Sequence, residues 1–455
     1  MDEARASETP EDAGRRLRPN SAEWRWLLVL TAVGLALRLA LIFGLRTYVI
    51  PPKDDHYLFA HEYGRIARSL AVGEGYACTF EIGKGGPTVN GAPFFAFSLS
   101  LLFRVFGVYS QAAAAALLVT NSVASVATVV LVFVLGKRLF GAGPGWLAAV
   151  VLCFDPTPVW YSVNCTWETA LSLFALTLLP LLFVWFADRP GARRGAVLGV
   201  AAAGLAHVNA GALTVSAVLG VWLLVRSRGL RVSVLRGVSV AALVGAATIA
   251  PWSVRNSLLL GRPVILRGAG DMVFYAGNHP GATGDVVEDE KAAYVTHNRA
   301  EREKYYRMGE AAYFSHCRER ALAFIREQPG VYARLVLKRG VIFWLGDLWT
   351  TRDWQGGVRT PFSLVGLKKM VHFVPVPFAI AGLVVALRRR CVVWPLVGQA
   401  AAFSIPYMLT FCALSRYRVP IHASLVLLSC VALSAAFAGV RGRWLEWRRE
   451  VRRSS

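Results

Sequence analysis

Two adjacent carboxylates, Asp54 and Asp55, are the first residues in the sequence whose type and position could do chemistry. They follow the first long apolar run, and His56 and Tyr57 come directly after them. A carboxylate so placed can act as a general base, which typically accelerates a reaction about 10²- to 10⁴-fold. Asp is also a preferred N-cap residue, so helix capping is the alternative role. These four residues are therefore candidates for a site at the mouth of the first apolar segment.

A third acid, Glu62, lies seven residues beyond Asp55 in a stretch with the period of an amphipathic helix. The apolar residues of this stretch recur at spacings of four, three and four, at Phe59, Tyr63, Ile66 and Leu70. Seven residues are about two helical turns, so we expect Asp55 and Glu62 along one edge of the apolar face. Such a helix would lie in the membrane interface and hold both carboxylates where lipid headgroups meet water. The alternative is that Glu62 is a solvated residue on the polar edge.

The composition indicates a membrane protein. Of the 455 residues, 55% are hydrophobic and 17% are charged, whereas average soluble proteins have about 45–50% apolar and about 25% charged residues. The apolar residues gather into runs, and about 20 residues suffice for a helix to cross the hydrocarbon core. We predict spans at 26–48, 110–136, 144–162, 168–187, 195–225, 233–254, 364–387, 391–413 and 419–440. The run 195–225 is too long for one span and has His207 and Asn209 at its centre, so we expect two short helices that meet there.

Ten spans and the distribution of charge predict the topology. The net charge is +22, but the basic residues form short clusters between apolar runs and no stripe with interleaved aromatics, which argues against a nucleic-acid partner. An even number of spans places both termini on one side together with every basic cluster, so the positive-inside rule predicts cytoplasmic termini.

The predicted fold class is an all-α integral membrane protein with two long outer segments. Its parts are an N-terminal tail 1–25, a transmembrane module 26–254 that contains the first outer loop 49–109, an outer segment 255–360, transmembrane helices 361–440 and a basic tail 441–455. Residues 301–344 within the outer segment show a helical pattern and would cap a cleft.

Four stretches of the sequence resemble a known family, in the family's order. The first runs from Asp55 to Tyr76 and contains EYGRIARSL and GEGY; the others are PFFAFSLSLLFRVFG at 93–107, PWSVRN at 251–256 with GNHPG at 277–281, and SRYRVP at 415–420. Together they resemble bacterial membrane glycosyltransferases of the GT-C type, family 39, which are related to protein O-mannosyltransferases and to the aminoarabinose transferase of lipid A. The resemblance implies a GT-C bundle with interfacial helices in the first outer loop and a small helical outer segment.

The resemblance also implies an activity. Enzymes of this family transfer a sugar, a hexose or a pentose, from a polyprenyl-phosphate donor to an extracytoplasmic acceptor on a lipid, a glycan or a protein. The leaving phosphate needs no protonation, so one carboxylate suffices as base, in contrast to the pair in most glycosidases. Many members read Asp-Glu where this chain reads Asp54-Asp55, and the match that extends to Glu62 favours Asp55 as the base. Direct displacement predicts inversion at the anomeric carbon.

The leaving phosphate would be held by arginine, whose planar fork of donors suits it. Arg416, Arg418 and Arg255, the last with Asn256, lie at outer ends of predicted spans, and snorkelling to lipid phosphates is the alternative for each. Further candidate substrate contacts are Glu62, His56, Tyr57, Glu168, Asn278 and His279. No spacing matches a zinc or calcium site, so we predict no metal and no other cofactor.

A polytopic transporter or flippase of a lipid-linked or anionic substrate is the alternative from another class. Its coupling carboxylates would lie near the membrane midplane on broken helices, whereas Asp54 and Asp55 are predicted at the outer interface. The sequence therefore favours a multi-pass glycosyltransferase of the inner membrane, with the lipid bilayer, the donor and the acceptor as partners. A disulfide between two of Cys78, Cys165 and Cys317 on the oxidising side remains an open alternative to free thiols.

Overall fold

The computed structural model describes residues 19–53, 55–227, 231–346, 370–411 and 415–454. These residues form helices joined by turns, and their β pairing is limited to two isolated bridges, Ala77 to Pro87 and Glu81 to Lys84. The predicted all-α fold class is confirmed.

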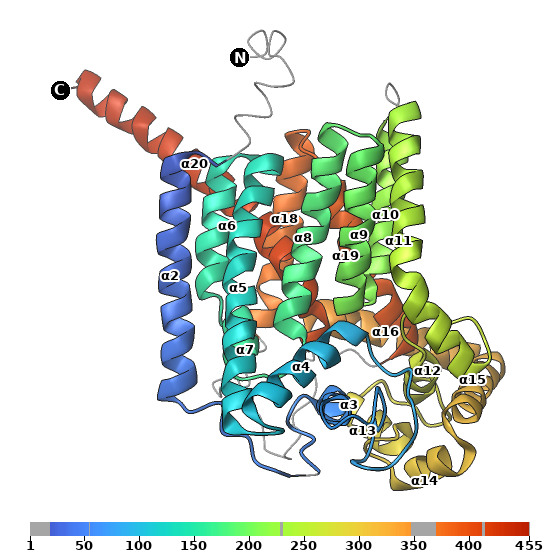
Figure 1. The fold of residues 1–455 in the computed structure, drawn as a ribbon. Coiled ribbons are helices and arrows are strands. Elements are labelled where there is room, and N and C mark those ends of the chain that lie inside the picture. The colour runs from blue at the N-terminus through green and yellow to red at the C-terminus, as the bar shows by residue number, and fades with distance from the viewer. Residues whose placement is uncertain (1–18, 54, 228–230, 347–369, 412–414, 455) are drawn as a thin grey trace.

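The helices of the membrane-spanning bundle coincide with the predicted apolar runs (Figure 1). They are α2 (Ser21–Gly44), α5 (Gln111–Phe140), α6 (Ala142–Phe154), α7 (Pro156–Val163), α8 (Thr169–Asp188), α9 (Ala192–Val208), α10 (Gly211–Arg226), α11 (Arg231–Leu260), α18 (Pro375–Arg388), α19 (Trp394–Thr410) and α20 (His422–Ser454).

Six helices in the described part of the chain are long and apolar enough to cross a membrane, or seven if α6 and α7, bent by 44° at Asp155, form one span. The other three predicted spans correspond to α9, α10 and α19, which have 17, 16 and 17 residues. The chain is therefore a multi-pass membrane protein.

The predicted break in the run 195–225 is confirmed. The α9 helix ends at Val208 and α10 begins at Gly211. Between them, the Asn209 side chain accepts a hydrogen bond from the Gly211 amide at 2.9 Å and donates one to Ser172 Oγ at 3.0 Å. A polar side chain thus satisfies backbone and side-chain groups that the break would otherwise leave unpaired inside the bundle.

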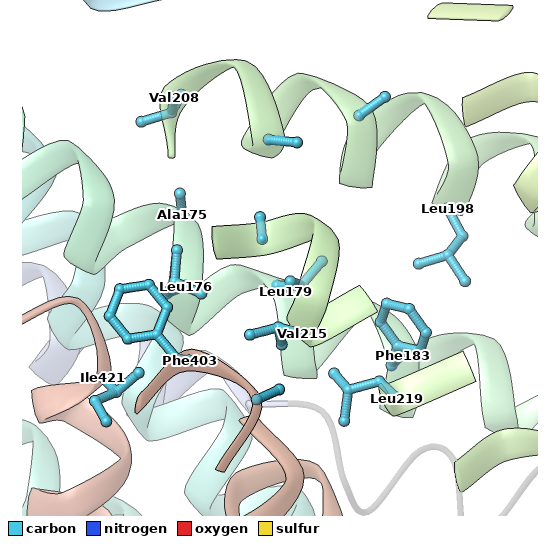
Figure 2. Close-up of a cluster of buried hydrophobic side chains, with 14 of the residues drawn as sticks. Ala175, Leu176, Leu179, Phe183, Leu198, Val208, Val215, Leu219, Phe403 and Ile421 are labelled. Atoms are coloured by element: carbon cyan, nitrogen blue, oxygen red, sulfur yellow. The ribbon is translucent and has the colours of Figure 1, made fainter. Parts of the chain in front are cut away.

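The largest hydrophobic cluster joins helices that are distant in sequence (Figure 2). Its buried side chains come from α8, α9, α10, α19 and the 3₁₀ segment η2 (Ser415–Ile421), and include Leu176, Leu179, Phe183, Leu198, Val215, Leu219, Phe403 and Ile421. This packing fixes the start of α20, and with it η2, against the middle of the bundle.

Small residues allow α9 and α11 to pack closely. A Cβ atom at Gly195 would collide with the Gly237 carbonyl oxygen, and one at Gly199 would collide with the Ala241 carbonyl oxygen. Close approach through small residues is a usual way for helices to associate where burial from water supplies no driving force. This contact packs α11 along α9, and the C-terminal end of α11 leads into the second outer segment.

The two long polar segments gather at one end of the bundle, opposite the start of α2 and the end of α20 (Figure 1). The first contains α3 (His61–Ala71) and α4 (Pro93–Phe106). The second contains α12 (Gly270–Gly277), α13 (Val286–Ala293), α14 (Arg299–Met308), α15 (Glu310–Glu327) and α16 (Pro329–Leu345). The predicted helical character of residues 301–344 is therefore confirmed.

The α4 helix has the two faces of an interfacial helix. Phe95, Leu99 and Phe103 are buried against the protein, while an exposed apolar stripe recurs every three or four residues at Phe94, Phe97, Leu101 and Val105. The exposed stripe provides the surface that meets lipid beside the site described next.

Candidate functional site

The stretch that carries the predicted acids is a turn and not a helix. Residues 55–60 form turns, and α3 begins only at His61, so the prediction that Asp55 and Glu62 share one helix edge is wrong. Left-handed backbone breaks the helix at Asp55, His56, Ala60 and His61, with φ angles of 57°, 55°, 63° and 53°. Such conformations cost about 1–2 kcal/mol per residue outside glycine. They cluster at functional sites, where the surroundings hold them.

Specific contacts hold this turn in place. The Ala60 amide donates to Thr166 Oγ1 at 3.1 Å, and the Thr166 hydroxyl donates to the Leu58 carbonyl at 3.2 Å. The Phe59 carbonyl lies directly against Gly64, where any Cβ atom would collide with it. The turn is therefore fastened both to α3 and to the segment before α8.

Asp55 is bound at the outer surface by two groups. Its Oδ2 accepts a hydrogen bond from the Ile82 amide at 2.8 Å and lies 3.6 Å from Arg65 Nε. The Asp55 side chain is 42% exposed, and the Arg65 guanidinium lies 5.4 Å from the centre of the Tyr57 ring. Asp54 lies outside the described residues. The neighbouring His56 ring stacks on Tyr109 at 4.2 Å between centroids.

Glu62, in the first turn of α3, lines a pocket between the two outer segments. The pocket wall consists of Glu62, Tyr63, Ile66, Asn90, Gly91, Arg267 and Tyr294, and its volume is about 30 Å³. The Glu62 Oε1 atom accepts hydrogen bonds from Thr296 Oγ1 at 2.9 Å and from the Tyr294 hydroxyl at 3.4 Å. The pocket holds little more than one water molecule.

The surroundings of Glu62 favour its charged form. Burial alone would raise the pKa of the Glu62 carboxyl, but hydrogen bonds from its own backbone amide and from Thr296, together with the Arg416 charge, hold this pKa below its ordinary value. Burial and the nearby Arg416 lower the pKa of His61 to about 3, so its ring is neutral at pH 7. The hydrogen bonds, the cation and the amino end of α3 therefore account for the ionised Glu62.

Arg416 is a cation whose charge acts on Glu62. Its guanidinium lies 4.6 Å from the Trp167 ring centre and 5.0 Å from that of Tyr417, and it donates to the Tyr417 hydroxyl at 3.2 Å. Glu168 and Glu290 both interact with it electrostatically. The structure thus brings together four residues predicted from sequence: Tyr57, Glu62, Glu168 and Arg416.

Arg267 is the residue of the site that the sequence did not indicate. Its side chain lines the Glu62 pocket and stays accessible to solvent although protein surrounds it, as expected on the wall of a cleft. Its guanidinium interacts electrostatically with the side chains of Tyr63, Tyr294, Tyr407 and Tyr417. In the described part of the chain no hydrogen bond or ion pair occupies its guanidinium. No motif surrounds Arg267, so only the fold could reveal it.

A second carboxyl, Glu290 of α13, faces the same cleft in its protonated form. Burial raises the pKa of Glu290 to about 8, and the charges of Glu62 and Asp289 add to this against the opposing charge of Arg416. Glu290 Oε2 lies 3.4 Å from His297 Nε2, and the His297 ring contacts Tyr57 edge-on at 5.7 Å. Glu62 and Glu290 therefore interact with each other and with Arg416 while carrying opposite protonation at pH 7.

Three of the predicted substrate-binding side chains donate to the protein's own backbone. Arg255 donates to the carbonyls of Thr88 and Tyr76 at 2.8 and 3.2 Å. Asn256 donates to Leu266 at 2.9 Å, and the fully buried Arg418 donates to the carbonyls of Trp344 and His372. In this arrangement these residues fasten loops to the bundle.

The remaining candidates lie in the second outer segment. Asn278 is buried and donates to the carbonyls of Phe274 and Thr410 at 2.8 and 2.9 Å. His279 Nδ1 lies 3.0 Å from the Pro280 carbonyl, and its buried Nε2 has no partner in the described residues. Neither residue lines the Glu62 pocket.

Within the described residues no group of three or more His, Cys, Asp or Glu side chains could hold a metal ion. The described cysteines, including Cys78, Cys165 and Cys317, are free thiols. A larger groove of about 490 Å³ lies at the other end of the molecule, between α2 and α6, and is lined by apolar residues such as Trp26, Val33 and Trp146. It lacks the convergent polar groups that a site for a charged donor needs.

The described residues thus form a multi-pass helical bundle with a charged, aromatic-lined pocket at one end. Residues 90–254 match the family model of dolichyl-phosphate-mannose-protein mannosyltransferases. Together with the fold, this match confirms the predicted resemblance to GT-C glycosyltransferases. Among curated proteins, none matches the chain in sequence.

Solved structures share the fold. The oligosaccharyltransferase AglB from Archaeoglobus fulgidus, bound to an inhibitory peptide and a dolichol-phosphate, is similar over 94% of this chain and 52% of its own, with 17% identity and a TM-score of 0.55. A structure of an Archaeoglobus fulgidus oligosaccharyltransferase tethered to an acceptor peptide is similar over 91% of this chain and 50% of its own, with 16% identity and a TM-score of 0.53. ArnT from Cupriavidus metallidurans, bound to undecaprenyl phosphate, aligns over 90% of this chain and 60% of its own, with 13% identity and a TM-score of 0.48. The chain thus spans about half the length of the AglB chain that it matches.

Proposed function

We propose that the protein transfers a sugar from a polyprenyl-phosphate donor to an acceptor on the extracytoplasmic face of the membrane, with inversion at the anomeric carbon. The observation that carries this proposal is the pocket lined by the ionised Glu62 and the accessible Arg267, with the Arg416 guanidinium near enough to lower the pKa of Glu62. Such a cleft offers cations for a phosphate and a carboxylate for a proton. The family match and the shared GT-C fold support the same reaction class.

The proposed roles follow from the position of each group. Arg267 and Arg416 hold the donor phosphate, because guanidinium donors suit phosphate oxygens and both side chains remain accessible. Tyr57, His61 and Trp167 form an aromatic wall of mutually contacting rings beside Arg416, against which a sugar ring packs. The lipid chain of the donor lies along the exposed apolar stripe of α4.

The same proposal fixes the orientation in the membrane. The cleft must face the outer side for a lipid-linked donor and an extracytoplasmic acceptor, so the start of α2 and the end of α20 face the cytoplasm (Figure 1). The basic clusters of the short loops then lie on the inner side, in agreement with the positive-inside rule. In bacteria this is the inner membrane.

The test is the release of polyprenyl phosphate from a panel of polyprenyl-phosphate sugars by the purified protein in lipid vesicles. The proposal predicts release from at least one donor, with the transferred sugar in the inverted anomeric configuration. If no donor is turned over and a labelled lipid crosses the bilayer instead, the protein is a flippase and the proposed function is wrong.

The protonation of Glu290 predicts a pH effect. Glu290 is neutral at pH 7 and ionises as the pH rises through about 8, which places a second negative charge beside Glu62 and Arg416. Since this charge opposes that of the donor phosphate, we expect kcat/KM to fall above about pH 8. In the Glu290→Gln variant, which stays neutral, that alkaline limb should disappear while the rate at pH 7 stays within a few-fold of wild type. An unchanged limb in the variant would show that another group is responsible.

A further inference from the structure

We infer that Glu62, and not Asp55, is the general base of the proposed transfer. The inference rests on the proposed function and assigns the catalytic carboxylate within the same cleft. It departs from the sequence prediction, in which Asp55 is the favoured base, Asp54 is the other catalytic candidate and Glu62 contacts substrate.

The Glu62 carboxylate has a fixed orientation on the pocket wall. Its hydrogen bonds to other described residues go to Oε1, from Thr296 at 2.9 Å and from Tyr294 at 3.4 Å, and its own backbone amide also donates to the carboxylate. The side chain lines the pocket. A general base needs such a fixed orientation at the place where the acceptor would enter.

Asp55 differs from Glu62 in its position, since its side-chain contacts also go to a single oxygen, Oδ2. Its Oδ2 already accepts from the Ile82 amide at 2.8 Å and is near Arg65, and the side chain does not line the pocket. Its contacts hold the loop 80–82 to the turn before α3, since Arg65 also donates to the Phe80 carbonyl at 2.5 Å. We therefore assign Asp55 a role in positioning this loop.

The protonation states of Glu62 and Glu290 indicate different roles for the two carboxyls. Glu62 is ionised and can accept a proton, whereas Glu290 on the facing helix α13 is neutral at pH 7. Carboxyls whose environments push their pKa values apart commonly divide the acid and base roles between them. Here the leaving phosphate needs no acid. Because Glu290 is protonated at pH 7, it does not compete with the phosphate for the charge of Arg416.

The chemical step balances with these groups. The acceptor O–H or N–H proton moves to the Glu62 carboxylate as the acceptor atom forms its bond to the anomeric carbon. The bond between that carbon and the phosphate oxygen breaks, and its electron pair leaves with the phosphate, beside Arg416 and Arg267. The products are the glycosylated acceptor and polyprenyl phosphate, and Glu62 later returns its proton to water.

The experiment compares Glu62→Gln with Asp55→Asn in the donor-release assay, each with a thermal-unfolding curve and a binding measurement for polyprenyl phosphate. We expect Glu62→Gln to lower kcat at least 10²-fold with polyprenyl phosphate bound within a few-fold of wild type, and Asp55→Asn to lower it less than 10-fold. Glu62→Asp should keep part of the activity. Formate should restore activity to Glu62→Ala and not to Asp55→Ala, because a small carboxylate fits the space that the truncation opens.

The inference is overturned if Asp55→Asn falls 10²-fold and formate rescues Asp55→Ala, or if Glu62→Gln loses polyprenyl phosphate binding in parallel with its rate. Should both acids prove necessary, the formate rescue decides between them. Failure of the proposed function is separate and is seen in the wild type, which would then release polyprenyl phosphate from no donor.

Discussion

Replacing Arg416 by Ala is expected to lower kcat/KM for the sugar donor at least 10²-fold, which corresponds to about 2.7 kcal/mol. The guanidinium lies among Glu62, Glu168 and Glu290 and stacks between Trp167 and Tyr417. Without it, a phosphate in the cleft would meet negative charge with only Arg267 to neutralise it. The measurement is the donor concentration dependence of polyprenyl phosphate release, together with direct binding of polyprenyl phosphate.

The matched control is Arg416→Lys, which keeps the charge but loses the planar stacking and the forked donors. We expect it to recover part of the donor binding, so that its kcat/KM lies between those of wild type and Arg416→Ala. Equal donor binding by wild type and Arg416→Ala would remove Arg416 from the phosphate site.

Replacing Arg418 by Met should instead destabilise the fold, by about 2–5 kcal/mol. The Arg418 side chain is fully buried, and its two terminal nitrogens donate to the carbonyls of Trp344 and His372. Removing one partner of a buried hydrogen bond costs about 1–3 kcal/mol for the group left unpaired, and two carbonyls lose their donor here. Thermal unfolding and hydrogen exchange at residues 341–346 and 370–374 measure the effect.

Comparison of the two variants separates binding from stability, although the two arginines are only two residues apart. The Arg418→Met protein that remains folded should bind polyprenyl phosphate within a few-fold of wild type. A variant with unchanged stability and lost donor binding would place Arg418 at the phosphate and reverse the two assignments.

The course of the chain through the membrane could be predicted from sequence, because it depends on local composition. A helix must satisfy its own backbone inside the bilayer, so each apolar run of sufficient length becomes a span. The break at Asn209 was equally visible, since a polar residue at the centre of an overlong run is costly unless it serves a turn. The helical character of residues 301–344 could likewise be predicted from their sequence pattern alone.

The acids show where such local reasoning ends. The apolar period from Phe59 to Leu70 predicted one helix through Asp55 and Glu62, but the left-handed backbone at four residues starts α3 at His61. That strain is sustained by Thr166, from the segment before α8, and by the packing of Phe59 against Gly64. A hydrogen bond between residues 106 positions apart, as between Ala60 and Thr166, cannot be predicted from the local pattern of apolar residues.

The sequence by itself predicted a helical membrane protein that resembles GT-C glycosyltransferases, with acids and arginines at the ends of its spans. Only the tertiary structure decided what each of them does. The guanidinium groups of Arg255 and Arg418 donate hydrogen bonds to backbone carbonyls and so stabilise the fold. Arg267 lines the Glu62 pocket, and no hydrogen bond or ion pair to a described residue occupies its guanidinium, so we propose it for the donor phosphate. The difference lies in which acceptors the folded chain brings near, and residue type and spacing do not contain that information.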